Sequence, residues 1–403
     1  MVQATDQLGA SSAGDNRVIA TIGAAHFVSH YHYLVLPPLF AFVRADYGVS
    51  YTELGFALVA YNLASAFLQT PAGFLVDRIG GRIPLFAALT IAGIAFAVVG
   101  LTESFWLLVA MFGVGGVANA VYHPADYALL SQEVAAERIA KAYSFHTFAG
   151  LLGSAAAPAS LLLMQGLWGW RGAFLGAAAL SLAVALLIAL QPRPAGATQA
   201  GSRKDNANAV KVGWPLLLSA PILFNFATFM LLAMINAGLQ NYSVVALGAL
   251  YGTPAVIANA ALTGYLGLAT VGVLAGGVLA AWFQRHDMLT MAGLAVAGSV
   301  MVLIVTGDPG NALLIAIMST IGFLTGFIMP SRDLLVRQVT PPGAFGTVFG
   351  FVTTGFNIAG VVAPLAFGLL MDHGHPQLVF VSCAALCLLA VATIAAQPGK
   401  PAS

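Results

Sequence analysis

The chain has 403 residues, of which 60% are hydrophobic and only 7% are charged. Soluble domains average about 45–50% apolar and about 25% charged residues, so this composition excludes a soluble globular protein and indicates an integral membrane protein. The formal net charge of +1 gives no electrostatic reason to expect nucleic acid as a partner, and the lipid bilayer is the expected environment.

Apolar segments recur along the chain, and each is long enough to cross a bilayer, which takes about 20 residues of helix. The first half has them at 18–43, 52–76, 83–101, 104–131, 139–166 and 172–191. The second half has them at 215–246, 254–283, 289–306, 311–336, 345–371 and 377–396. The pattern therefore predicts an all-α membrane protein with twelve transmembrane helices.

One long polar segment, 192–214, interrupts this pattern and reads PRPAGATQAGSRKDNANAVKVGW. It separates six apolar segments from six, which predicts a cytoplasmic linker between an N-terminal bundle, 18–191, and a C-terminal bundle, 215–396. The segments 1–17 and 397–403 are expected to be cytoplasmic tails.

The basic residues predict the orientation, because cytoplasmic loops of membrane proteins carry an excess of Lys and Arg. With both termini in the cytoplasm, only Arg44 and Arg171 of the 15 basic residues fall on the outer side. We expect a multi-pass protein of a bacterial-type inner (plasma) membrane that has both termini in the cytoplasm.

The two halves repeat each other. The segment His123-Pro124-Ala125-Asp126 aligns with Met329-Pro330-Ser331-Arg332, and Pro158 then falls on Pro364 without a gap. Two six-helix halves related by a parallel repeat are the arrangement described for major facilitator transporters.

The loop at 73–82, GFLVDRIGGR, resembles the G-x-x-x-D-R-x-G-R-R loop between helices 2 and 3 of the major facilitator superfamily. The second-half copy at 277–285, GVLAAWFQR, keeps the glycine and has lost the acid. The stretches VYHP at 121–124 and GSAAAP at 153–158 are similar to fosmidomycin-resistance-like exporters within that superfamily. The resemblance covers essentially the whole chain and implies two pseudo-symmetric six-helix bundles that transport by alternating access.

Charged residues near the cytoplasmic face are candidates for a conformational gate. The resemblance implies that Asp77 contacts helix 11 of the opposite half when the protein faces outward, and Gly73 is expected to permit close helix packing. Ionisable residues inside a membrane are costly unless paired, so we expect Asp126 to pair with Arg78 or Arg82 and Asp333 to pair with Arg332 or Arg337. His123 or His146 could also join Asp126 in a proton relay. Static ion pairs within each half are the alternative. The gating candidates are Gly73, Asp77, Arg78, Arg82, Asp126, Arg332 and Asp333.

Polar residues in the apolar helices are candidates for a path for solute and protons. His26 and His30 are one helical turn apart, and because histidine titrates near neutral pH, the pair could carry protons or bind an anion. A structural role and a metal site are the alternatives, but no carboxylate or cysteine nearby in the sequence completes such a site, and we expect no metal. The path candidates are His26, His30, Tyr33, His123, His146, Asn225, Asn236, Gln240 and Asn357.

The expected function is secondary active transport of a small organic solute coupled to protons. The sequence has no G-x-x-x-x-G-K-[ST] loop for ATP, and we expect no cofactor. Few acids lie deep in the helices, which favours a neutral, zwitterionic or anionic solute. The leading hypothesis is antiport, or efflux, of a drug-like or metabolic compound by a monomer. The alternatives are a symporter that takes up a small organic acid and a non-transporting sensor. An enzyme is not expected, because the helices hold no cluster of acids.

Overall fold

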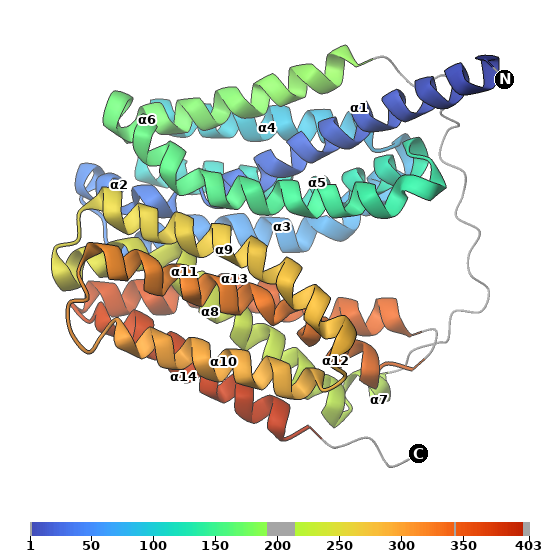
Figure 1. Cartoon of the computed structure of the whole chain (residues 1–403). Helices are drawn as coiled ribbons and strands as arrows, with labels where there is room; N and C mark the ends of the chain where they lie inside the picture. Colours follow the sequence, from blue (N-terminus) through green and yellow to red (C-terminus); the bar gives the residue numbers. More distant parts are fainter. Residues whose placement is uncertain (1, 192–213, 342–343, 398–403) are drawn as a thin grey trace. The chain divides into compact units, whose positions relative to one another are not determined.

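The computed structural model describes residues 2–191, 214–341 and 344–397, and these residues contain helices and no strands (Figure 1). Most of the linker predicted at 192–214 lies outside the described residues. The elements in chain order are α1 (Val2–Tyr33), η1 (Pro37–Leu39), α2 (Phe40–Tyr47), α3 (Tyr51–Ile79), α4 (Arg82–Leu101), α5 (Phe105–Glu133), η2 (Ala136–Arg138), α6 (Ile139–Leu190), α7 (Trp214–Leu217), α8 (Ala220–Tyr251), α9 (Ala255–Trp282), α10 (His286–Leu303), α11 (Asn311–Phe327), α12 (Met329–Val339), α13 (Phe345–Asp372) and α14 (Gln377–Ala395).

Nine helices in these described ranges are long and apolar enough to cross a membrane. One of them, Lys141–Leu190, has 50 residues, about twice the length that a span needs. It breaks at Gly169, whose φ of 71° suits glycine, and so contains two of the predicted spans. The helices α1 and α3, with 32 and 29 residues, also exceed the length of a span. Together these helices account for the twelve predicted spans.

The largest local difference from the prediction is at the N-terminus. The helix α1 begins at Val2, within the predicted tail, and ends at Tyr33. The first span was expected to continue to residue 43, but Pro37 begins the short 3-10 helix η1, because a proline ring cannot continue an α-helix from its interior.

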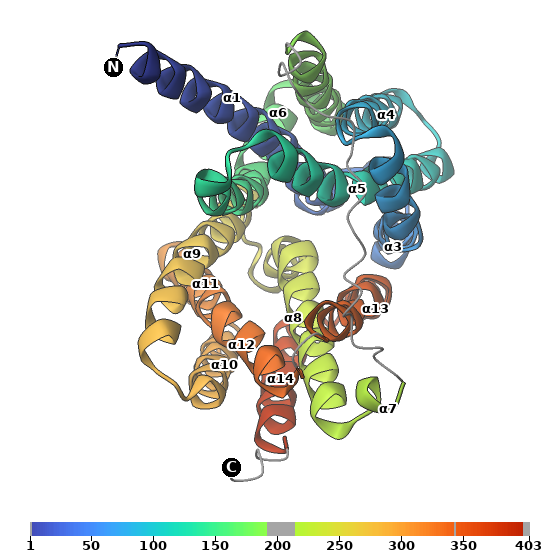
Figure 2. The ribbon, with the colours of Figure 1, turned by 90° about the vertical axis from the view of Figure 1, so that its right-hand side faces the viewer.

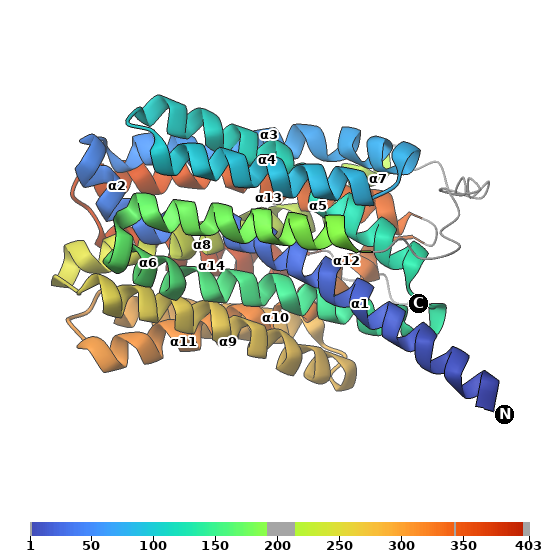
Figure 3. The same cartoon turned by 90° about the horizontal axis from the view of Figure 1, so that it is seen from above.

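The chain forms two compact units. Unit 1 comprises Met1–Tyr47 and Ala60–Arg203, and unit 2 comprises Gly48–Val59 and Lys204–Ser403. In unit 1, α1 packs against α5 and α6, and α4 packs against the same two helices (Figures 1 and 3). In unit 2, α9 packs along α11, and α8 packs against α13 and α14 (Figure 2).

The first turns of α3 belong to unit 2, where Asp372 at the end of α13 caps them. The Asp372 carboxylate accepts hydrogen bonds from the backbone N–H groups of Tyr51, at 2.7 Å, and Thr52, at 2.8 Å. These N–H groups have no partner within their own helix, and a negative charge is favourable at a helix N-terminus. Gly368 gives α3 room to approach, because a Cβ there would lie 2.8 Å from the Cα of Thr52.

Glycines form the seam between α9 and α11 in unit 2. Gly272 and Gly276 of α9, and Gly322 and Gly326 of α11, each face a backbone carbonyl of the other helix so closely that a Cβ would collide with it. Small residues four apart allow membrane helices to approach in this way, and packing then replaces the hydrophobic effect that is absent in lipid.

We expect Gly276→Ala to lower the free energy of unfolding by about 1–3 kcal/mol, the usual cost of overpacking. Thermal unfolding of the purified protein in detergent measures this. The control is the neighbouring residue, because a Cβ at Gly277 would meet nothing within 4 Å. Equal effects of Gly276→Ala and Gly277→Ala would contradict this account of the seam.

Candidate functional site

Unit 1 concentrates polar side chains where α1, α5 and α6 meet. We call His26, His30, His123, Asp126 and His146 the histidine cluster. The side chains of His26, Asp126 and His146 are buried, and Asp126 is 0% exposed. His30 is half-buried and His123 is exposed, so the cluster reaches the surface of unit 1 through His123.

The carboxylate of Asp126 organises the cluster. Nε2 of His146 donates a hydrogen bond to Oδ2 of Asp126 at 3.0 Å, and Nδ1 of His26 lies 3.3 Å from the same oxygen. The rings of His26 and His146 stack with their centroids 3.6 Å apart. The centroids of His30 and His123 lie 4.6 Å and 5.0 Å from that of His26. One carboxylate oxygen is therefore shared by two imidazoles, with two further imidazoles beside them.

Glycines on α6 make room for the cluster. A Cβ at Gly150 would lie 2.6 Å from Cδ2 of His26 and 2.9 Å from Cδ2 of His30, and a Cβ at Gly153 would collide with the backbone of α1. Between them, these glycines let α1 and α6 approach closely. The next residue, Ser154, forms a hydrogen bond of 3.2 Å through its Oγ to Nδ1 of His30.

The sequence identifies every member of the cluster, and of the partners expected for Asp126 the structure shows His146 beside it and not an arginine. An arginine of the 73–82 loop was expected, and this prediction is wrong, because the Asp126 carboxylate faces His26 and His146. Arg82 instead donates to the carbonyl oxygens of Ile188, at 2.8 Å, and Gln191. The last carbonyls of α6 lack helical partners, so Arg82 caps that helix.

The expectation that no carboxylate lies beside His26 is also wrong, for the same reason. The cluster moreover has the donor set of a metal site, since ligand atoms of His26, His123 and His146 lie within 4.8 Å of one another. Within the described residues this is the group that could hold a metal ion.

Unit 2 holds a buried cation at the position that the repeat aligns with Asp126. The side chain of Arg332 on α12 is 7% exposed. Its Nε and Nη2 donate to Oδ1 of Asp333 at 3.0 Å and 2.8 Å, which confirms the predicted pair. The guanidinium also lies 4.2 Å from the centroid of the Phe229 ring, a stabilising cation–π contact.

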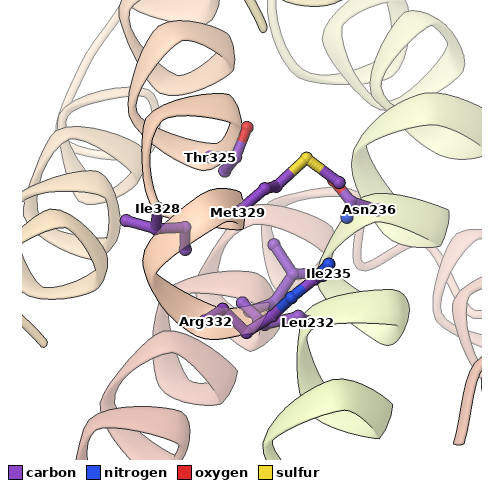
Figure 4. A pocket seen from close by; sticks show the side chains of 7 residues that line it. All are labelled: Leu232, Ile235, Asn236, Thr325, Ile328, Met329 and Arg332. Atoms are coloured by element: carbon purple, nitrogen blue, oxygen red, sulfur yellow. The ribbon is translucent and has the colours of Figure 1, made fainter. Parts of the chain in front are cut away.

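A small pocket opens beside Arg332 (Figure 4). Its volume is about 10 Å³, which is room for about one water molecule, and its walls are Leu232, Ile235, Asn236, Thr325, Ile328, Met329 and Arg332. Oδ1 of Asn236 accepts a hydrogen bond of 2.6 Å from the Tyr265 hydroxyl, which orients the amide nitrogen of Asn236 as a donor. The Arg332 guanidinium and the Asn236 amide are donors that suit an anionic oxygen, and a larger anionic group requires this space to widen.

Among the other predicted path residues, Gln240 forms a side-chain hydrogen bond to Tyr265, the partner of Asn236, and the rest lie outside both groups. Tyr33 packs against Tyr61, with ring centroids 6.0 Å apart. Asn225 is buried, but its Nδ2 donates to a backbone carbonyl one turn earlier, at 2.8 Å. Gln240 is half-buried on α8, and Asn357 is exposed on α13.

The 73–82 loop has the predicted turn but not the predicted packing. Gly80 has a φ of +80°, which suits glycine in a tight reversal. A Cβ at Gly73 would meet nothing within 4 Å, so its expected packing role is wrong, and the close approach is at Gly81, where a Cβ would lie 2.8 Å from a carbonyl oxygen of α5. Asp77 and Arg78 are exposed at the end of α3. The contact of Asp77 with the opposite half stays a prediction.

Three more polar residues complete these two groups. Ser154 contacts the histidine cluster, Tyr265 orients Asn236, and Thr325 lines the pocket. Ser154 belongs to the GSAAAP stretch and Tyr265 is one of several aromatics that could line a path, but Thr325 is a single hydroxyl that nothing in its apolar helix distinguishes.

Comparison with known proteins identifies sequence relatives along most of the chain. The model of the Major Facilitator Superfamily matches residues 22–350 and 311–402. A "Probable sulfoacetate transporter" of Cupriavidus necator is 28% identical, over 85% of this chain and 84% of its own length. The "Fosmidomycin resistance protein" of Escherichia coli is 22% identical, over 94% and 92%. A "D-galactonate transporter" of Escherichia coli is 22% identical, over 86% and 87%.

Solved structures share the fold at low sequence identity. A bacterial homolog of the human lysosomal transporter Spinster, in an inward-facing and occupied conformation, has a TM-score of 0.76 and 14% identity, over 94% of this chain and 96% of that one. A nucleoside transporter has a TM-score of 0.77 and 14% identity, over 94% and 99%.

Proposed function

The chain belongs to the major facilitator superfamily, a family of transporters and not of enzymes, and we propose that it carries a small organic anion together with protons. The observation that carries this proposal is the buried Arg332 in the wall of the unit 2 pocket. A buried cation is costly unless it is compensated, and the carboxylate that pairs with Arg332 among the described residues, that of Asp333, has a side chain that is 45% exposed.

The geometry of Arg332 supports an anionic solute. Asp333 accepts from Nε and Nη2, so Nη1 is the group that can donate to a carboxylate or sulfonate, and Nδ2 of Asn236 can donate beside it. Two of the relatives are named for sulfoacetate and D-galactonate, which are organic acids. The names of these relatives and the buried arginine therefore favour a small organic acid over a drug-like compound as the solute.

For the uptake direction, the charge of such a solute favours proton symport. Moving an anion into a cell whose interior is negative costs about 2.3 kcal/mol per charge for each 100 mV of potential. Protons that move in the same direction offset this charge. We propose the histidine cluster as their carrier, because Asp126 and the four imidazoles are groups that exchange protons and exposed His123 connects them to the surface of unit 1.

We propose that the chain acts as a monomer in a bacterial inner membrane with both termini in the cytoplasm. Asp77 and Arg78, at the exposed end of α3, form the conformational latch that the family loop implies.

A solute screen tests the proposed substrate class. Small carboxylates and sulfonates should raise the thermal unfolding temperature of the purified protein, whereas organic cations and neutral sugars of similar size should not. The acid that stabilises the protein most should then enter proteoliposomes by way of the protein. Stabilisation by cations or neutral sugars alone would contradict an anionic substrate.

A further inference from the structure

Three imidazoles from three helices converge in the histidine cluster at a spacing close to that of a metal site. Ligand atoms of His26, His123 and His146 lie within 4.8 Å of one another. Two nitrogens bound to one zinc ion lie roughly 3.3 Å apart, because each is about 2.0–2.1 Å from the metal in a tetrahedral site. Closing the cluster around an ion therefore takes movements of about 1 Å or less, which rotation of the rings can supply.

The cluster also contains buried polar atoms that lack partners. Nδ1 of His146 and Oδ1 of Asp126 are buried and have no hydrogen-bond partner in the described part of the chain, and Nδ1 of His26 lies 3.3 Å from Oδ2 of Asp126 without forming a hydrogen bond. Buried polar atoms almost always have partners, and each exception needs an explanation, such as an ion. A metal ion would use the two nitrogen lone pairs at once and would compensate the buried carboxylate.

Asp126 stands where metal sites place a supporting carboxylate. It accepts a hydrogen bond from Nε2 of His146, which leaves the opposite ring nitrogen of His146 as the ligand atom. Histidine ligands usually donate their second N–H to a carboxylate or carbonyl in this way, and the bond fixes the tautomer and the ring orientation.

We infer that the histidine cluster binds one divalent transition-metal ion through His26, His123 and His146, with Asp126 orienting His146 and offsetting the charge of the ion. Imidazole nitrogens select zinc, copper, nickel or iron, whereas magnesium and calcium require oxygen ligands. With three nitrogen ligands the ion keeps an open position, and exposed His123 provides the route by which it enters.

The bound ion would tie α1, α5 and α6 together and would occupy the ring nitrogens that protons also use. Zinc should therefore inhibit proton-coupled transport. The binding itself does not depend on transport, so it is tested without solute or gradient, and its failure leaves the proposed transport function standing.

The test is a titration of the chelator-treated, purified full chain with Co²⁺, followed by visible absorption, and with Zn²⁺, followed by calorimetry. We expect one ion per chain, an absorption spectrum of tetrahedral cobalt, and no response to Mg²⁺. His123→Asn, at the exposed ligand, should weaken binding at least about tenfold, and His26→Asn should abolish it. The matched control is His32→Asn, because His32 is buried on the same helix but bonds to the carbonyl of Ala177 at 3.1 Å.

Two further comparisons exclude the cysteines as ligands and a folding defect as the cause of lost binding. Cys383 and Cys387 are also potential ligands, and they are free thiols, so Cys383→Ala with Cys387→Ala should leave binding unchanged. Should His26→Asn not fold, wild type and His123→Asn decide the question. The inference is overturned if wild type binds neither Co²⁺ nor Zn²⁺, if His123→Asn binds as tightly as wild type, or if only the cysteine variant loses the ion.

Discussion

Arg332→Gln is expected to weaken binding of the organic anion by about 10- to 100-fold. A hydrogen bond to a charged group contributes about 1.5–3 kcal/mol, and each 1.4 kcal/mol corresponds to a factor of ten in affinity. Glutamine keeps a donor, at a shorter reach, but removes the charge that compensates a carboxylate or sulfonate. Calorimetric titration with the acid that most stabilises wild type measures the loss.

The same helix provides the control for Arg332→Gln. Arg337 on α12 is exposed and is absent from the pocket wall, so Arg337→Gln should bind the acid with wild-type affinity. Equal losses in the two variants would mean that general surface charge, and not the pocket, attracts the solute. Unchanged affinity in Arg332→Gln would remove the pocket from the account.

Asp126→Asn is expected to reduce proton-driven accumulation of the solute at least about tenfold, because the lost charge-assisted hydrogen bond to His146 is itself about 1.5–3 kcal/mol. The amide cannot exchange a proton or hold the negative charge that His26 and His146 face. Exchange of labelled for unlabelled solute across the membrane needs no net proton movement. We therefore expect exchange to continue in this variant, and assays of accumulation and exchange on the same proteoliposomes check the difference.

Asp287→Asn is the matched control for this change. Asp287 pairs with Arg285 at 3.1 Å, and its side chain is 40% exposed. Exposed ion pairs of this kind contribute little to stability. Removal of this carboxylate should leave both accumulation and exchange unchanged. If Asp126→Asn instead loses exchange and accumulation to the same degree, Asp126 is needed for movement or folding and not for coupling.

The apolar segments predict the helices of this protein well, because a span has to bury about 20 consecutive residues in lipid whatever its neighbours are. Where the prediction is wrong, the reason is local. A proline pair ends α1 at Tyr33, and α6 is continuous through the loop expected at 167–171 except for the break at Gly169.

The partners of the charged residues are less predictable than their identities. The sequence places Asp126 and His26 in different apolar segments, and nothing in either segment fixes how their helices are rotated against each other. The sequence places Arg82 and Asp126 both near the cytoplasmic face, which suggests that they pair. In the structure, Arg82 caps α6 and Asp126 faces the imidazoles. The pair of Arg332 with Asp333 is predictable because the two residues are adjacent in sequence.

The sequence likewise does not show which glycines lie at close contacts between helices. The chain has 44 glycines, so glycine alone does not identify a close contact. The internal repeat singles out Gly277, but it is the neighbouring Gly276 that faces the carbonyl of Phe327. In the 73–82 loop the close helix contact is made by Gly81 and not by Gly73, because α5 approaches the loop at Gly81.

The most direct test of proton-coupled anion transport follows the internal pH and the solute content of the same proteoliposomes in sodium-free buffer. When the organic acid is added outside, we expect the interior to acidify as the solute enters, an inward proton gradient to drive accumulation, and a protonophore to abolish it. Accumulation that is unaffected by the protonophore, or that requires sodium, would contradict the account.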